Sequence, residues 1–371
     1  DNISKIIMVN DARQYCYLKG PFELKFGGVL HSPTIAFETW GTLNASKDNG
    51  VLIFTGLSPS AHAASADADP SLGWWEDIVG PNKPVDTNQY FVICANSLGS
   101  CFGSTGPTSI NPKTEEPYRL EFPKLALEDI AATTKEVLKH LGIDSLKAVV
   151  GPSMGGMTAM GLLLKYPNIC EQLLLISTAS ASRPFSISLR SLQRLMITSD
   201  PDWKSGQYTV DDLPLNGMKL ARMLGMITYR SAAEWNQRFG RDLVPSSENR
   251  DSFFKVDFQI EQYLHNRSND FVGSFDPNAY LYLSRAIDLF DLGAYGESLA
   301  DALSGFELDK ITIIGVDKDF IFPFDYQLEL CNAFQENKID CKLIQLESMQ
   351  GHDSFLVDTE NFGSAIRTFF T

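Results

Sequence analysis

The sequence predicts an α/β protein, with a mostly parallel sheet flanked by helices and a helical segment inserted before its last strands. Short, continuous apolar runs recur along the chain, as is typical of strands buried on both faces of a parallel sheet. Helical patterns separate several of these runs. From about residue 181 to 305 the apolar runs stop while helical patterns continue, which indicates an insertion.

The expected strands are VLIFTG (51–56), YFVICAN (90–96), LKAVVG (146–151), QLLLIST (172–178), ITIIGV (311–316) and CKLIQLE (341–347). The expected helices of the sheet domain repeat apolar residues every three or four positions over 127–142 and 156–167. Helical stretches of the insertion cover 186–199, 217–240 and 276–293. We therefore expect residues 1–180 and 306–371 to form the α/β domain and residues 181–305 to form a helical lid.

Composition limits the possible partners. The 371 residues include 31 Lys and Arg against 46 Asp and Glu, a net charge of −15. A surface this negative repels phosphate backbones and anionic lipids, so neither nucleic acid nor a membrane surface is an expected partner. An anionic substrate would have to be held by a few local arginines or lysines. No apolar run approaches 18 residues, and the first twenty residues lack the apolar stretch of a signal peptide.

Cysteine and histidine usage indicates neither disulfides nor a metal site. The six cysteines are scattered, without a C-x-x-C pair or a Cys/His cluster. We expect reduced thiols and a cytoplasmic protein. The five histidines show no H-E-x-x-H spacing, so we expect no metal.

The sharpest local signal is Gly-Pro-Ser-Met-Gly at 151–155, a G-x-S-x-G pattern between an expected strand and an expected helix. A sharp turn in that context exposes the hydroxyl of Ser153 above the sheet, and the glycines leave room for neighbouring backbone. The N–H of Met154 then points to a developing oxyanion. The N–H of Leu57, in the loop after the strand 51–56, is the candidate second donor. This pattern predicts acyl transfer through a serine ester.

A nucleophilic serine needs an orienting acid and a base, which follow it in the chain in that order. His352 comes after the expected strand 341–347, whereas His265 lies in a helical pattern of the insertion. The acid is expected after the strand 311–316, where both Asp317 and Asp319 are candidates. His62 precedes the serine, so we expect it to shape the pocket instead. The same three groups serve either hydrolysis or transfer to another hydroxyl, and the residues alone leave both reactions open.

Six longer segments carry a resemblance that spans nearly the whole chain: 73–112, 149–157, 221–231, 275–291, 317–323 and 350–356. With these segments the sequence resembles the homoserine O-acyltransferases, a family of α/β hydrolases. The resemblance implies the α/β-hydrolase fold with an inserted helical lid, and a homodimer formed through that lid. It assigns Ser153 as nucleophile, His352 as base and Asp319, rather than Asp317, as acid.

The resemblance also implies the substrates. Arg222, in the A-R-x-x-G motif, and Asp353 would bind the amino acid, and an arginine and a carboxylate match its carboxylate and its ammonium. An acyl-CoA would be the cosubstrate of a ping-pong reaction in methionine or cysteine biosynthesis, without a permanently bound cofactor.

Two further segments bear on the acyl group. GLSPSAHAA (56–64) and PFSISLRSLQR (184–194) resemble the subgroup that acylates serine or homoserine with succinyl-CoA. A succinyl carboxylate requires its own cation, for which Arg190 and Arg183 are candidates. A homoserine O-acetyltransferase that uses acetyl-CoA is one alternative, and an esterase with the same triad is the other.

Overall fold

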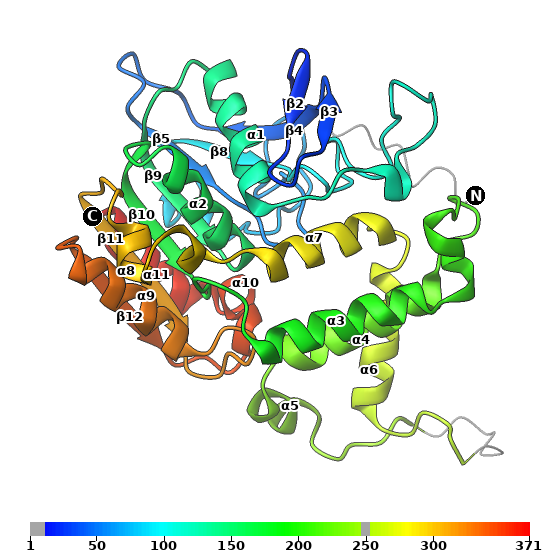
Figure 1. Cartoon of the computed structure of the whole chain (residues 1–371). Helices are drawn as coiled ribbons and strands as arrows, with labels where there is room; N and C mark the ends of the chain where they lie inside the picture. The colour runs from blue at the N-terminus through cyan, green and yellow to red at the C-terminus, as the bar shows by residue number, and fades with distance from the viewer. Residues whose placement is uncertain (1–11, 246–252) are drawn as a thin grey trace.

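A central sheet of eight strands forms the body of the protein in a computed structural model that describes residues 12–245 and 253–371 (Figure 1). In spatial order the strands are β1 (Gln14–Tyr17), β4 (Thr34–Trp40), β8 (Phe91–Ala95), β5 (Gly50–Ile53), β9 (Leu146–Pro152), β10 (Cys170–Ile176), β11 (Lys310–Val316) and β12 (Cys341–Leu346). Strand β4 is antiparallel to both of its neighbours, and all pairings from β8 to β12 are parallel. The sheet is therefore mostly parallel, as predicted.

The parallel strands are buried on both faces, which explains their continuous apolar sequence. Along β10, Leu173 and Leu175 belong to one core cluster, while Leu174 and Ile176 belong to the other. The first cluster also contains residues of α1 (Leu127–His140), α2 (Met154–Lys165) and α9 (Phe324–Glu336), and the second contains residues of α11 (Thr359–Phe370). The sheet thus lies between two layers of helices.

The strand order places the carboxyl ends of several strands around one point. Strand β5 pairs with β8 on one side and with β9 on the other. The chain therefore passes from β5 to a neighbour on one side and later returns to place β9 on the opposite side. Ligands of open α/β sheets bind beside the carboxyl ends at such a point. The loops after β5, β9, β11 and β12 carry Leu57, Ser153, Asp319 and His352, respectively.

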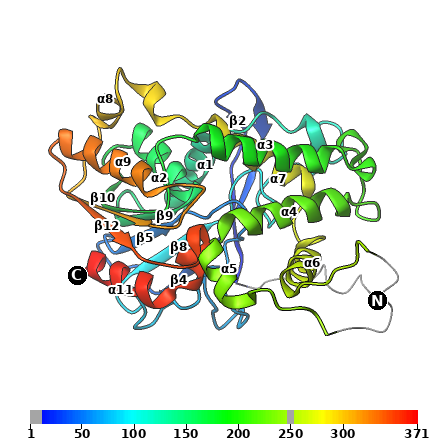
Figure 2. The ribbon, with the colours of Figure 1, turned by 90° about the horizontal axis from the view of Figure 1, so that it is seen from below.

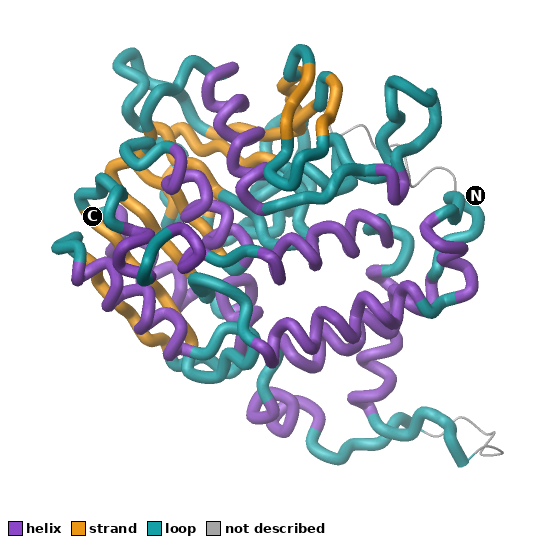
Figure 3. Tube along the Cα trace, in the orientation of Figure 1, coloured by secondary structure: helices purple, strands orange, loops and turns teal. Residues whose placement is uncertain are grey.

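In the described residues of the segment 181–305 the helices are the dominant elements, and Figure 3 shows the contrast with the strands of the sheet domain. The lid contains α3 (Pro184–Thr198), α4 (Leu215–Tyr229), α5 (Ala232–Phe239), α6 (Gln259–Phe271) and α7 (Pro277–Leu289). Figure 2 shows α3, α4 and α6 grouped beside the sheet domain. The chain leaves and re-enters the sheet domain side by side, because Ala181 and Asp291 form an antiparallel bridge. Helix α8 (Leu299–Leu303), inside the range predicted for the insertion, packs against α9.

Several elements differ from the prediction. The expected helical stretch 217–240 is interrupted between α4 and α5, where Arg230 has extended backbone. The sequence did not predict β1, β4, the hairpin of β2 (Pro21–Glu23) and β3 (Val29–His31), or the short pair β6 (Val79–Gly80) and β7 (Val85–Asp86). Strand β1 illustrates the reason: three of its four residues are exposed at the edge of the sheet, so it has no apolar run.

All six cysteines lie in the described residues and are free thiols. Within residues 12–245 and 253–371, no helix has both the length and the apolar character that crossing a bilayer requires. Residues 1–11, which belong to the N-terminal stretch considered for a signal peptide, lie outside the described residues, as do residues 246–252 of the predicted lid.

Candidate active site

Ser153 lies in the turn between β9 and α2, with φ 54° and ψ −123°, a conformation that residues other than glycine rarely adopt. Its N–H donates to the carbonyl oxygen of Ile176 (2.8 Å), and its own carbonyl oxygen accepts from Thr178 Oγ1 (2.7 Å). Glycine is required nearby, because a Cβ on Gly155 would lie 2.7 Å from the carbonyl oxygen of Phe54. The packing thus holds a strained serine at the carboxyl end of β9.

Two hydrogen bonds join Ser153 to residues far along the chain. His352 Nε2 lies 2.8 Å from Ser153 Oγ, and His352 Nδ1 lies 2.7 Å from Asp319 Oδ2. The other carboxylate oxygen of Asp319 accepts the N–H groups of Ile321 (2.8 Å) and Phe322 (2.9 Å). Because both of its oxygens are engaged, Asp319 is fixed in place and turns Nε2 of His352 toward the serine.

Asp317, the alternative acid, faces a different set of partners. Its carboxylate pairs with Lys318 (2.6 Å) and accepts the N–H of Ser348 (3.2 Å). Asp317 therefore anchors the start of the loop that carries His352, whereas Asp319 contacts the imidazole itself.

His352 is 5% exposed and packs among the rings of Tyr229, Phe322 and Phe355. Burial lowers the pKa of His352, but the charge and the hydrogen bond of Asp319 outweigh it, so the pKa lies above its ordinary value. A histidine in this environment can take the proton of Ser153 and keep the resulting charge paired.

A cavity of about 90 Å³ adjoins Ser153 and His352. Leu57 and Met154, the two predicted oxyanion donors, both line it. Met154 is the first residue of α2, so its N–H is one of the amides that the helix itself leaves without a partner. The partial positive charge at the helix N-terminus adds to this effect and favours an anion beside the serine.

The two arginines considered for the acyl group lie in different places. Arg190 is buried and lines this cavity, with Nε 2.6 Å from Asp288 Oδ1. Arg194 lies 2.7 Å from the other oxygen of Asp288, so two arginines share one carboxylate and the group formed by these three residues carries a net positive charge. Arg183 is half-exposed and pairs with Glu329 (2.6 Å) away from the cavity. The structure thus brings Arg190, but not Arg183, to the predicted site.

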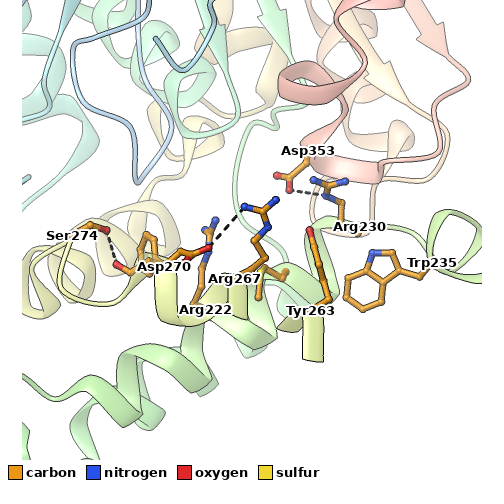
Figure 4. A pocket seen from close by; sticks show the side chains of 10 residues that line it. Arg222, Arg230, Trp235, Tyr263, Arg267, Asp270, Ser274 and Asp353 are labelled. Atoms are coloured by element: carbon orange, nitrogen blue, oxygen red, sulfur yellow. Dashed lines mark hydrogen bonds and ion pairs between the residues drawn. The ribbon is translucent and has the colours of Figure 1, made fainter. Parts of the chain in front are cut away.

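Arg222 and Asp353 line a second cavity, of about 390 Å³, between lid helices and the loop of His352 (Figure 4). Asp353 also lines the cavity of Ser153, so the two cavities meet at this residue. The guanidinium of Arg222 lies 4.5 Å from the centre of the Phe271 ring, and its buried Nε has no hydrogen-bond partner among the described residues. An anionic group entering the cavity would satisfy it.

The lid touches the His352 loop at the junction between α4 and α5, a contact that the sequence did not reveal. Arg230 Nε lies 3.1 Å from Asp353 Oδ2, and Ser231 Oγ donates to the carbonyl oxygen of Met349. Gly351, with φ +62°, allows the backbones to meet closely. The sequence gives one hint of this contact: Arg230 and Ser231 are the last two residues of 221–231, one of the six segments that carry the family resemblance.

A second supporting residue that the sequence did not reveal is Gln327 on α9. Its buried amide donates to the carbonyl oxygens of Thr178 (2.5 Å) and Phe322 (3.3 Å). Thr178 in turn binds the backbone of Ser153, and Phe322 binds Asp319. A glutamine within an amphipathic helix usually indicates a solvent-facing position, so nothing in the sequence pointed to this role.

His62, which we expected to shape the pocket, supports a loop instead of lining either cavity. Its nitrogens bind Glu38 Oε2 (2.9 Å) and the carbonyl oxygen of Ser71 (2.8 Å). Glu38, His62 and Asp69 offer ligand atoms within 4.8 Å of one another, the spacing of a metal site. Since both ring nitrogens of His62 already have partners, hydrogen bonding accounts for its orientation.

Comparison with known proteins gives the family. Residues 51–359 match the family described as alpha/beta hydrolase fold. The serine O-succinyltransferase of Stenotrophomonas maltophilia (strain K279a) is 50% identical over 355 residues, which cover 95% of each chain. The serine O-succinyltransferase of Litchfieldella anticariensis is 47% identical over 360 residues, which cover 97% of this chain and 98% of that one.

The chain belongs to the homoserine O-acyltransferase family of the α/β hydrolases. A solved relative, the homoserine O-acetyltransferase of Bacillus anthracis, superposes with a TM-score of 0.89 at 28% identity and 97% coverage of both chains. Esterase E22 superposes with a TM-score of 0.88 at 30% identity, over 97% of this chain and 99% of that one. The predicted fold and family are confirmed. This member of the family is an acyltransferase.

Proposed function

We propose that this acyltransferase moves a succinyl group from succinyl-CoA to the side-chain hydroxyl of L-serine or L-homoserine, through an ester on Ser153. The observation that carries the proposal is the hydrogen-bonded series Ser153–His352–Asp319, which opens on a cavity whose wall includes Arg190. The 50% identity to a serine O-succinyltransferase supports the same reaction.

The first half-reaction forms the acyl-enzyme. Ser153 Oγ attacks the thioester carbonyl carbon while its proton passes to His352 Nε2. Asp319 pairs with the imidazolium, and the N–H groups of Leu57 and Met154 stabilise the oxyanion. The carbon–sulfur bond then breaks, and the CoA thiolate takes the proton from His352.

The second half-reaction transfers the acyl group to the amino acid. Arg222 binds its carboxylate and Asp353 its ammonium, which brings the side-chain hydroxyl to the ester. His352 takes the hydroxyl proton, the oxygen attacks the ester carbonyl, and Ser153 leaves with that proton. The product ester would enter methionine or cysteine biosynthesis in the cytoplasm, and the six free thiols support a reducing compartment.

Arg190 favours the succinyl group over the acetyl group. Its guanidinium shares Asp288 with Arg194, so the group formed by these three residues carries a net positive charge at the wall of the Ser153 cavity. An acyl chain that ends in a carboxylate neutralises this charge, whereas an acetyl group does not. Similarity to the homoserine O-acetyltransferase of B. anthracis leaves acetyl transfer as one alternative reaction. Similarity to esterase E22 leaves hydrolysis as the other.

We propose a homodimer through the lid. Phe185, Leu192 and Leu195 are half-exposed on α3, with spacings of seven and three residues that place them on one helical face. Leu220 and Ile227 are exposed in the same way on the neighbouring α4. A second copy of the chain would bury this apolar surface.

A pre-steady-state experiment tests the proposed function. Succinyl-CoA without an acceptor should release about one CoA per active site in a burst, and the intact mass should increase by one succinyl group located on the Ser153 peptide. Crossing succinyl-CoA and acetyl-CoA with serine and homoserine then ranks donors and acceptors. An adduct on another residue, or kinetics that require a ternary complex, would contradict the mechanism, and free succinate with every acceptor would identify an esterase.

A further inference from the structure

The larger cavity has lining residues that the proposed reaction leaves unassigned. Asp353 lines both this cavity and the cavity of Ser153, so the two meet there. Trp235, Tyr263 and Arg267, on α5 and α6, line the larger cavity together with Arg222 (Figure 4). At about 390 Å³, the cavity offers far more space than an amino acid as small as serine needs.

Three arginines (Arg222, Arg230 and Arg267) and two carboxylates (Asp270 and Asp353) line this cavity, although the chain as a whole carries a net charge of −15. The side chain of Arg267 is 59% exposed, and the nearest carboxylate oxygen of Asp270 is 3.9 Å away, so this pairing is weak. Arg238 packs 4.5 Å from the centre of the Tyr263 ring but is not among the residues that line the cavity. Arg267 therefore retains donors for an incoming anion.

The aromatic side chains add a second property. The guanidinium carbons of Arg238 and Arg267 lie 4.5 and 5.8 Å from the centre of the Tyr263 ring, and Trp235 lines the same cavity as Tyr263 and Arg267. Guanidinium groups bind phosphate oxygens through paired N–H donors, and flat rings stack on nucleobases. An exposed arginine and aromatic rings that line one cavity therefore match a ligand that carries both phosphates and a base.

We propose that Trp235, Tyr263 and Arg267 bind the nucleotide end of the acyl-CoA donor, with Arg267 on its phosphates and an aromatic ring against its adenine. This inference rests on the proposed function, which supplies the donor. The pantetheine arm would pass Asp353 and bring the thioester to Ser153. In a ping-pong reaction CoA leaves before the amino acid enters, so one channel can admit both substrates in turn.

The test compares donors with and without the nucleotide. In the full-length protein, Arg267→Ala should raise the KM for succinyl-CoA about 3- to 10-fold, and Arg267→Glu should raise it further, because a phosphate contact is lost or reversed. Neither variant should change the KM for succinyl-pantetheine, which lacks the nucleotide, or the KM for the amino acid. Arg285→Ala, at an exposed arginine of α7, is the matched control and should leave all three constants unchanged.

Direct binding separates this inference from the proposed function. Calorimetry should show that free CoA binds wild-type protein more tightly than pantetheine does, and that Arg267→Glu removes the difference. Equal affinity for the two ligands, or equal KM changes for both donors, would overturn the nucleotide site even if Ser153 is acylated normally. A protein that binds CoA through Arg267 but forms no acyl-Ser153 would overturn the proposed reaction and leave the nucleotide site standing.

Discussion

His62 Nδ1 lies 2.9 Å from Glu38 Oε2, and His62 Nε2 lies 2.8 Å from the carbonyl oxygen of Ser71. The Glu38 carboxylate and the Ser71 carbonyl both accept hydrogen bonds, so this arrangement favours the imidazolium form of His62, in which both ring nitrogens donate. Burial lowers the pKa of His62, but the Ser71 carbonyl and the Glu38 carboxylate raise it more, so the net pKa is above its ordinary value. This ion pair ties the segment that follows Leu57 to strand β4.

The first prediction concerns the stability that this pair supplies. His62→Gln should lower the free energy of unfolding by about 3 kcal/mol near pH 6, because it leaves Glu38 buried without a counter-charge. A raised folded-state pKa gives stability that is complete below the unfolded pKa of about 6.5 and is lost as the pH rises through the folded value. The difference between wild type and variant should therefore shrink at alkaline pH.

Chemical denaturation of both proteins across this pH range measures the difference. The double variant Glu38→Gln/His62→Gln is the control and should recover part of the loss, since it removes the unpaired charge. Asp69, 3.6 Å from His62 Nε2, stays unchanged in both proteins. A stability difference that does not vary with pH would show that His62 is not charged in the folded protein.

The second prediction concerns the catalytic acid. Asp319→Asn should lower kcat by about 10⁴-fold, because the amide cannot stabilise the imidazolium and favours the wrong tautomer of His352. Asp317→Asn should have a much smaller effect, since Asp317 contacts Lys318 and the N–H of Ser348. Single-turnover acylation measures both, and the reverse ranking would contradict the assignment.

The pH profile supplies a second measurement of the same assignment. His352 must be neutral to accept a proton, so activity falls as the pH drops through its pKa. Asp319 raises that pKa. In the pH profile of the residual activity of Asp319→Asn, the acidic limb should therefore move to lower pH. In the pH profile of Asp317→Asn, the acidic limb should stay where it is in wild type.

The third prediction concerns the acyl group. Wild type should have a higher kcat/KM with succinyl-CoA than with acetyl-CoA, and Arg190→Ala should lose about 2–5 kcal/mol of transition-state stabilisation with succinyl-CoA. Acetyl transfer should change little. Arg183→Ala is the matched control, because Arg183 pairs with Glu329 outside the cavity. A wild-type preference for acetyl-CoA would contradict the succinyl assignment and leave the triad untouched.

The fourth prediction concerns assembly. Leu195→Glu should shift the protein from dimer to monomer, because a carboxylate in the centre of an apolar interface is desolvated without a partner. Light scattering coupled to gel filtration measures the mass. Leu328→Glu, at a similarly half-exposed leucine on α9, should leave the mass unchanged. A monomeric wild type would refute the proposed dimer.

The amino-acid sequence by itself determined the parallel part of the sheet and the turn at Ser153. Strands buried on both faces must be apolar throughout, so β5, β8, β9, β10 and β11 are visible as continuous runs. The serine turn is visible because its steric demands are local: Gly155 is needed within two residues of Ser153, where a Cβ would meet the backbone of Phe54.

Only the tertiary structure decided which charged groups meet. From the residues alone Asp317 and Asp319 are equivalent, as are Arg183 and Arg190, because each pair lies on one short segment with the same chemistry. Their partners lie far away in the chain: His352 contacts Asp319, and Asp288 contacts Arg190. Such contacts depend on how distant elements pack against one another, and for an ionisable group this packing also sets its charge, which no local pattern records.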